Sequence, residues 1–157
     1  MFAARPVETG FFESAPVRLK DSFEIALPAA QVWAELVGEN PLSWCRVLRD
    51  ITWTSPRPFG VGTTRTVRTQ GSLSVFDEYF FRWEEGRQKS FYVVQARMPG
   101  FRAFAEDYLV EPLTESTCRF TWTIAYEPQP VARLMTAPNR LLLTTLFRDT
   151  RRHFGVR

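Results

Sequence analysis

The sequence has few of the residues that most often carry metal or redox chemistry. Among 157 residues there is one histidine, His153, and there are two cysteines, Cys45 and Cys118. Neither a metal-ligand spacing nor an HExxH or CxxC motif surrounds them. A Rieske iron centre would need pairs of cysteine and histidine, which the chain does not have. We therefore expect no metal and no cofactor, and we expect both cysteines to be reduced.

Long apolar runs and lysine are also scarce. No segment approaches the ~20 apolar residues of a membrane span, and the first residues lack the apolar core of a signal peptide. We therefore expect a cytoplasmic protein with no membrane span. Only two lysines, Lys20 and Lys89, accompany 18 arginines. That ratio is typical of a GC-rich genome and suggests a bacterial source.

The net charge of +3 is confined to the C-terminal end. Residues 147–157 carry four Arg and one Asp, whereas residues 1–146 carry 16 basic and 16 acidic residues. A nucleic-acid-binding protein needs a basic stripe across a whole face. We therefore expect no nucleic-acid partner. The basic residues at this end are expected to stabilise the C-terminus of a helix through its dipole.

Aromatic residues are abundant, at 15% with 14 Phe and 5 Trp, and such side chains fill wide cores or line pockets. The length suits one domain, which we place at residues 17–157 after an N-terminal extension of residues 1–16. Alternation of apolar and polar residues predicts seven strands. These are residues 17–27, 51–54, 63–70, 72–84, 89–97, 102–112 and 117–127.

Helical signals occur in two places. Two short helices are predicted after the first strand, over residues 29–38 and 40–49. Apolar residues at 3-4 spacing predict a short helix before Pro138 and a long one over residues 137–154. Consecutive strands of this kind pair antiparallel, which gives an α+β fold. A helix of ~17 residues is roughly 25 Å long. It cannot fill the hollow of a curved sheet, so we predict a ligand pocket between them.

Several segments resemble one family in their order and spacing. They are FEIALPAAQVWAELV, FGVGTTRTVR, FDEYFFRWEEGRQKSFYV, CRFTWTIAYEP and the terminal helix. Over residues 17–154 the chain resembles the START/Bet v 1-like helix-grip superfamily, also called SRPBCC or polyketide cyclase/dehydrase-like. The resemblance implies a seven-stranded antiparallel sheet wrapped around a long C-terminal helix. Members bind lipids, sterols, polyketides, hormones or flavonoids; some are aromatase/cyclases and some are ribosome-associated.

Strand parity suggests which polar groups enter the pocket. On residues 72–84 we expect Glu78, Phe80 and Arg82 to face inward, with Glu78 and Arg82 close enough to pair. Glu106 shares parity with apolar neighbours and is a further pocket carboxylate. Glu78, Arg82 and Glu106 are therefore candidate catalytic groups, because a carboxylate beside an Arg can act as acid or base while the Arg stabilises an enolate.

Other side chains on these strands have consequences for partners. Arg65 and Arg68 have opposite parity, so one of them can point inward and bind a ligand oxygen. Outward-facing Tyr79, Phe81 and Trp83 need cover, either from residues 1–16 or from a second copy in a homodimer.

The expected pocket wall is made of apolar and aromatic side chains from the strands and the last helix. It comprises Phe80, Phe91, Val93, Phe104, Tyr108, Phe120, Trp122, Leu143 and Phe147. The first functional hypothesis is a binding or carrier protein for a hydrophobic small molecule or lipid. The second is an aromatase/cyclase-type enzyme acting on a polyketide-like substrate, and the third is a protein-interaction role. The sequence leaves open whether the chain is an enzyme.

Overall fold

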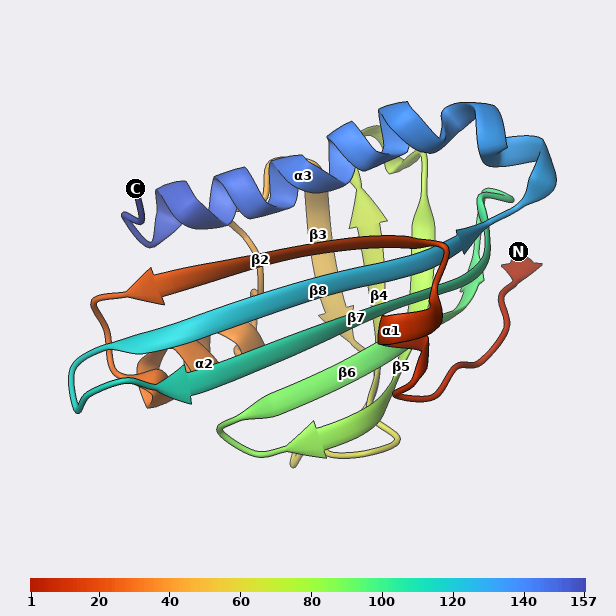
Figure 1. Cartoon of the computed structure of the whole chain (residues 1–157). Coiled ribbons are helices and arrows are strands. Elements are labelled where there is room, and N and C mark those ends of the chain that lie inside the picture. Colours follow the sequence, from red (N-terminus) through yellow and green to blue (C-terminus); the bar gives the residue numbers. More distant parts are fainter.

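The computed structural model describes residues 1–157, the side chain of Thr136 apart, and shows a curved sheet around one long helix (Figure 1). The strands are β1 Phe2–Ala3, β2 Val17–Ile25, β3 Leu48–Trp53, β4 Thr64–Thr69, β5 Val75–Glu84, β6 Gln88–Ala96, β7 Phe101–Pro112 and β8 Cys118–Pro128. The helices are α1 Phe11–Ser14, α2 Ala29–Val37 and α3 Thr136–His153, with 3-10 turns η1 Gln70–Ser72 and η2 Pro130–Met135.

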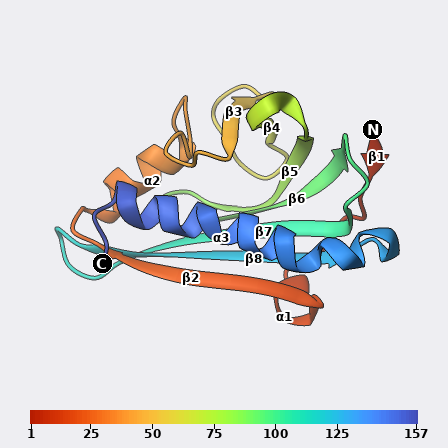
Figure 2. The ribbon, with the colours of Figure 1, turned by 90° about the horizontal axis from the view of Figure 1, so that it is seen from above.

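The seven predicted strands form one antiparallel sheet in the order β2-β8-β7-β6-β5-β4-β3. Very short β1 pairs with the end of β6 as an eighth strand. Seen from above, the sheet curls so that α3 crosses its concave side, while α1 lies on the convex side (Figure 2). The expected α+β helix-grip architecture is confirmed.

The first short helix is confirmed, but the second is wrong. Helix α2 follows Pro28 and ends before Gly38. Residues 41–44 form a turn instead of a helix, and β3 begins at Leu48. Leu42 has φ 57°, a left-handed conformation that a right-handed helix cannot continue through. The turn buries Leu42 and brings Trp44 within reach of α3, where its Nε1 donates a hydrogen bond to Thr150 Oγ1 at 3.0 Å.

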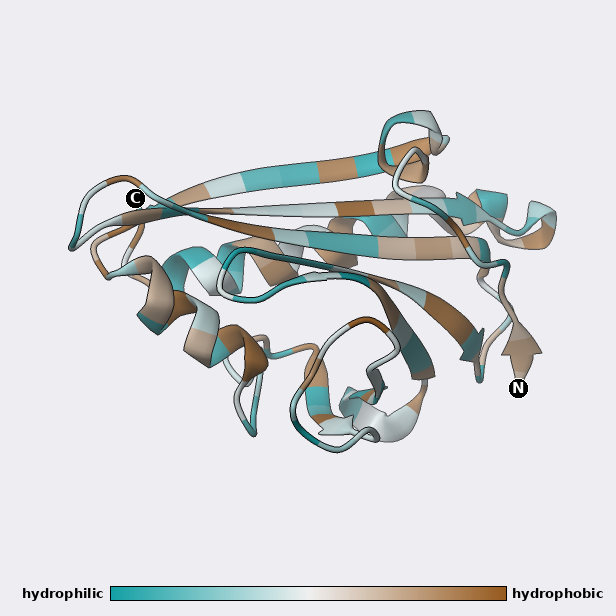
Figure 3. Ribbon diagram, turned by 90° about the horizontal axis from the view of Figure 1, so that it is seen from below, coloured by the Kyte–Doolittle hydropathy of each residue, from teal (hydrophilic) through white to brown (hydrophobic). Residues whose placement is uncertain are grey.

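The N-terminal segment covers the convex face of the sheet. Phe11 packs with Val7 and Ala15 against three alanines of β7 and β8, Ala103, Ala105 and Ala125. Small residues on these strands leave room for the large ring. Phe12 stacks on Phe81 with ring centroids 6.3 Å apart. Bands of hydrophobic and hydrophilic residues alternate along the strands in the view from below (Figure 3).

A β-bulge in β5 corrects the predicted faces of that strand. The pairing of β5 with β6 shifts register between Phe80 and Arg82. Glu78 and Phe80 face inward as expected, and Phe81 faces outward. Beyond the bulge the faces are exchanged, because one extra residue moves every later side chain to the opposite face. Trp83 therefore packs in the core, with its ring 5.2 Å from that of Phe80, and Arg82 lies on the convex side.

Candidate functional site

A cavity of ≈ 510 Å³ lies between α3 and the concave face of the sheet. Strands β3 to β8 supply its floor. Helix α3 and the α2–β3, β4–β5 and β6–β7 connections supply the rest of its wall and its rim. Most of the lining side chains are apolar, and the charged ones are Arg65, Glu78 and Glu106. The predicted position of a pocket between the last helix and the sheet therefore matches the structure.

Six of the nine expected wall residues line this cavity: Phe91, Val93, Phe104, Tyr108, Trp122 and Leu143. The other three, Phe80, Phe120 and Phe147, do not line the cavity, because their rings pack against other side chains of the core. Phe147 is wedged between Phe23 and Trp122, with ring centroids at 6.4 and 5.5 Å. The rim includes residues that parity could not reveal, since they lie in connections or on the less buried side of α3: Leu73, Met98, Met135 and Leu142.

The inward arginine is Arg65 of β4, which is paired with Glu78 of β5 in the sheet register. Its Nε donates a hydrogen bond to Glu78 Oε2 at 2.5 Å, and the two side chains are 1% and 6% exposed. Glu78 thus has a buried arginine partner, but it is Arg65 and not Arg82 as predicted. Arg68 is turned the other way and pairs with Asp50 at 3.0 Å.

Arg65 lines the cavity, and its guanidinium carries a buried nitrogen without a hydrogen-bond partner. Among the described residues, Arg65 Nη1 has no hydrogen-bond partner although it is buried. The guanidinium lies 4.8 Å from the ring centroid of Phe91 and 5.1 Å from that of Phe80. Burial lowers the pKa of Arg65, but Glu78, Tyr108 and Glu106 together outweigh that effect and the net pKa is raised. Arg65 is therefore a fixed cation with a free N–H group.

Glu106 of β7 is the second cavity carboxylate, as predicted from parity. Its Oε2 accepts hydrogen bonds from Tyr108 Oη at 2.6 Å and from Trp122 Nε1 at 2.9 Å. Burial, with a smaller contribution from the negative charge of Glu78, raises the pKa of Glu106 to about 7. A carboxyl group with such a pKa can both give and take a proton near neutrality.

Lys89 carries a buried amine that the sequence pattern did not mark as a site group. Its side chain is 1% exposed, and its Nζ donates to Leu36 O at 3.0 Å. The Nζ atom lies 4.7 Å from the ring centroid of Tyr108 and 5.2 Å from that of Phe80. Burial, and then the positive charge of Arg65, lower the pKa of Lys89 well below its usual value. The sequence could have indicated this, because Lys89 lies two residues before Phe91 and so shares its inward face, in a chain with only two lysines.

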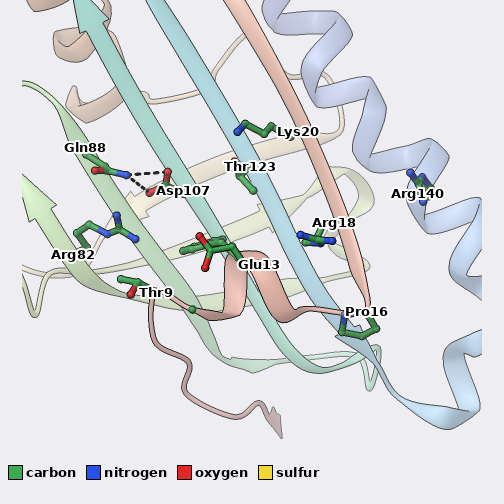
Figure 4. Close-up of a pocket in the computed structure, with 12 residues that line it drawn as sticks. Thr9, Glu13, Pro16, Arg18, Lys20, Arg82, Gln88, Asp107, Thr123 and Arg140 are labelled. Carbon is green, nitrogen blue, oxygen red and sulfur yellow. Dashed lines mark hydrogen bonds between the residues drawn. The ribbon is translucent and has the colours of Figure 1, made fainter.

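A second hollow of ≈ 880 Å³ lies on the convex face beside α1, and its lining is polar (Figure 4). Gln88 and Asp107 lie side by side in its lining, where Gln88 Nε2 donates hydrogen bonds of 3.1 Å to both carboxylate oxygens of Asp107. Arg82 lies beside them, and Arg18 lies on β2 (Figure 4). Arg82 therefore belongs to this hollow and is not a group of the apolar cavity.

The remaining reactive residue types lie away from the cavity. His153 stacks on Trp44 with ring centroids 4.1 Å apart, and its Nε2 is 2.8 Å from Glu35 Oε2. Cys45 and Cys118 are buried and free. Within the described part of the chain, no three His, Cys, Asp or Glu residues gather closely enough to hold a metal ion. None of the described helices is long and apolar enough to cross a membrane.

Comparisons with known proteins agree with this geometry. Residues 16–150 match the family described as polyketide cyclase / dehydrase and lipid transport. Uncharacterised proteins of Mycobacterium tuberculosis and Mycobacterium bovis are 33% identical over 164 residues, covering 100% of this chain and 96% of theirs.

Solved structures share the fold at low sequence identity. A START superfamily protein from Mycobacterium smegmatis superposes with a TM-score of 0.71 at 15% identity, over 88% of this chain and 97% of that one. Norcoclaurine synthase from Thalictrum flavum, in complex with dopamine and hydroxybenzaldehyde, superposes with a TM-score of 0.62 at 12% identity. The match covers 95% of this chain and 92% of the synthase. The chain therefore belongs to the polyketide cyclase/dehydrase and lipid-transport family, with the START-like helix-grip fold that its sequence resembles.

Proposed function

We propose that the chain binds a hydrophobic small molecule or lipid in the cavity between α3 and the sheet, as a binding or carrier protein. The observation that carries the proposal is a largely apolar cavity of ≈ 510 Å³ with a few buried polar groups on its wall. Cavities of about 300–1,000 Å³ with this kind of lining are typical of small-molecule sites. Packing defects in protein cores are rarely larger than a water molecule.

The free donor of Arg65 supports a ligand that carries an oxygen. A buried N–H group without a partner is costly, and a ligand oxygen at Nη1 would remove that cost. The charge of Arg65 is already balanced by Glu78. A neutral acceptor such as a carbonyl or hydroxyl oxygen therefore fits better than a second carboxylate. The ligand we infer is an apolar body with a carbonyl or hydroxyl group at its inner end.

Fluorescence titration with Nile red, a neutral apolar probe that carries a carbonyl, tests this proposal. The wild type should bind it saturably. Leu143→Trp adds a large side chain to the cavity wall and should weaken binding at least tenfold. The matched control is Leu113→Trp, at an exposed position in the β7–β8 connection, which should bind like the wild type. Absence of saturable binding, or equal binding by Leu143→Trp with an unchanged melting temperature, would contradict the proposal.

A second candidate function is that of an aromatase/cyclase acting on a polyketide-like substrate. The observation that favours it is Glu106, whose pKa is raised to about 7 by burial beside the cavity. Such a group can remove a proton next to a substrate carbonyl while Arg65 stabilises the developing enolate. Glu106→Gln would then abolish turnover of a poly-β-ketone substrate while Nile red binding persists. Turnover unchanged in this variant would exclude Glu106 as the base.

A further inference from the structure

Exposed apolar side chains gather around the opening of the cavity. They come from the β4–β5 connection, the β6–β7 connection, and η2 with the first turns of α3. They are Leu73, Met98, Val131, Leu134, Met135, Leu141 and Leu142, here called the rim patch. Four of them, Leu73, Met98, Met135 and Leu142, also line the cavity, so the patch borders its opening. These seven are the majority of the twelve exposed large hydrophobic side chains among the described residues.

The rim patch projects from one end of the molecule. Figure 1 shows η2 and the start of α3 at the end where the β6–β7 connection also lies, with the β7–β8 connection at the opposite end. Val131 and Leu134 are 79% and 92% exposed, and residues three apart in a 3-10 helix project from the same side. Soluble monomers rarely expose a contiguous apolar patch of this kind unless it contacts something.

The charge around the rim patch has one sign. Residues 128–148 contain Arg133, Arg140 and Arg148 and no Asp or Glu. Glu127, which precedes this segment, is neutralised by Arg5 at 2.9 Å and lies 3.7 Å from Arg102. A second copy of the chain would place like charges against each other. A bilayer with anionic headgroups offers both the opposite charge and an apolar layer beneath it.

We propose that the rim patch docks on an anionic lipid bilayer, with the opening of the cavity facing the lipid. The apolar side chains enter the headgroup boundary, and Arg133 contacts lipid phosphates. Docking of this kind needs no ligand in the cavity. Passage of a ligand between bilayer and cavity would additionally rest on the proposed function.

Vesicle flotation with the full chain tests the docking. Vesicles of equal parts phosphatidylglycerol and phosphatidylcholine should carry the protein, and pure phosphatidylcholine vesicles should carry at least tenfold less. Binding should also fall at 0.5 M NaCl, since salt screens exposed charges. Arg133→Gln should weaken binding to the anionic vesicles by about fivefold.

The apolar contribution is tested by Leu134→Glu combined with Leu141→Glu, which should reduce binding at least tenfold. Both positions are exposed, at 92% and 71%, so this variant should keep its fold and its Nile red binding. The matched control is Leu113→Glu, 43% exposed at the other end of the molecule, which should bind vesicles like the wild type.

Three results would overturn the membrane proposal. The first is a wild type that does not float with anionic vesicles. The second is an equal loss of binding in Leu113→Glu and in the rim variant. The third is a dimer in analytical ultracentrifugation that disappears in the rim variant without any vesicle binding, which would assign the patch to a second copy. Nile red binding retained in these cases would leave the proposed function standing, so the two failures are distinguishable.

Discussion

Arg65 and Glu78 lie directly opposite each other on β4 and β5 and form an ion pair inside the protein, with Nε 2.5 Å from Oε2. A buried pair adds little net stability, because removing two charges from water offsets their attraction. The pair holds the Arg65 guanidinium still, with Nη1 buried and without a hydrogen-bond partner. Under the proposed function, the pair orients the ligand more than it stabilises the fold.

Breaking this pair should nevertheless be costly. Glu78→Gln leaves Arg65 charged and uncompensated in the core, and we expect the free energy of unfolding to fall by about 3–5 kcal/mol. Urea denaturation measures it. Glu24→Gln, which breaks the exposed pair with Arg119, is the matched control and should cost less than about 1 kcal/mol. Similar small losses in both variants would mean that water reaches the Arg65–Glu78 pair.

Trp122 should be the most sensitive aromatic position of β8. It is 0% exposed, and its ring lies 5.1 Å from that of Tyr108 and 5.5 Å from that of Phe147. Trp122→Ala should lower the free energy of unfolding by about 3–5 kcal/mol, as large-to-small changes in cores do. Val94→Ala, at a 42% exposed site, should stay within about 1 kcal/mol of the wild type. Equal effects in denaturant titrations would place Trp122 outside the core.

Glu106 should make stability fall as the pH rises. Its pKa is about 7 in the folded state against 4.5 in the unfolded chain, so the folded state holds the proton more tightly between these two pH values. The contribution of the protonated form is fully present below pH 4.5 and is lost as the pH rises to about 7, by about 3 kcal/mol. Comparing the free energy of unfolding of the wild type and of Glu106→Gln at pH 5, 6, 7 and 8 isolates the contribution of Glu106. Parallel profiles would show that Glu106 has an ordinary pKa.

Lys89 should be a net cost to the fold near neutral pH. Burial lowers its pKa in the folded state, so the unfolded chain binds a proton that the folded chain does not, and stability falls as the pH decreases from 10. Lys89→Met removes that cost and loses the hydrogen bond to Leu36 O. We expect a gain of about 1–2 kcal/mol at pH 7 and less at pH 10. Exposed Lys20→Met is the control, and a loss of stability in Lys89→Met at both pH values would refute this account.

The strand pattern made most of the fold predictable from the sequence. In residues 118–126, Cys118, Phe120 and Trp122 alternate with polar or small residues, and all three are buried on one face of β8. Glu106 was placed in the cavity wall by the same reasoning. Alternation has a period of two, so it identifies a face wherever the strand is regular.

The wrong predictions occur where a bulge interrupts the alternation of a strand, or where a contact depends on the register between two strands. The bulge at Phe80 and Arg82 exchanges the two faces of β5, and nothing in the local alternation marks it. The pairing of Arg65 with Glu78 depends on how β4 lies beside β5, which a single sequence does not specify. Lys89 was missed because its burial depends on neighbours from distant segments of the chain. The carbonyl oxygen of Leu36 accepts a hydrogen bond from its amine, and the ring of Tyr108 lies beside it.

A crystal structure of the protein with Nile red would show directly where the probe binds. We expect the apolar rings of the probe in the cavity between α3 and the sheet, beside Phe91 and Leu143. We expect the carbonyl oxygen of the probe within about 3.2 Å of the Arg65 guanidinium, the length of an N–H···O hydrogen bond. A probe bound only in the convex-face hollow beside Arg82, or a cavity closed by α3 in the presence of saturating probe, would contradict the account.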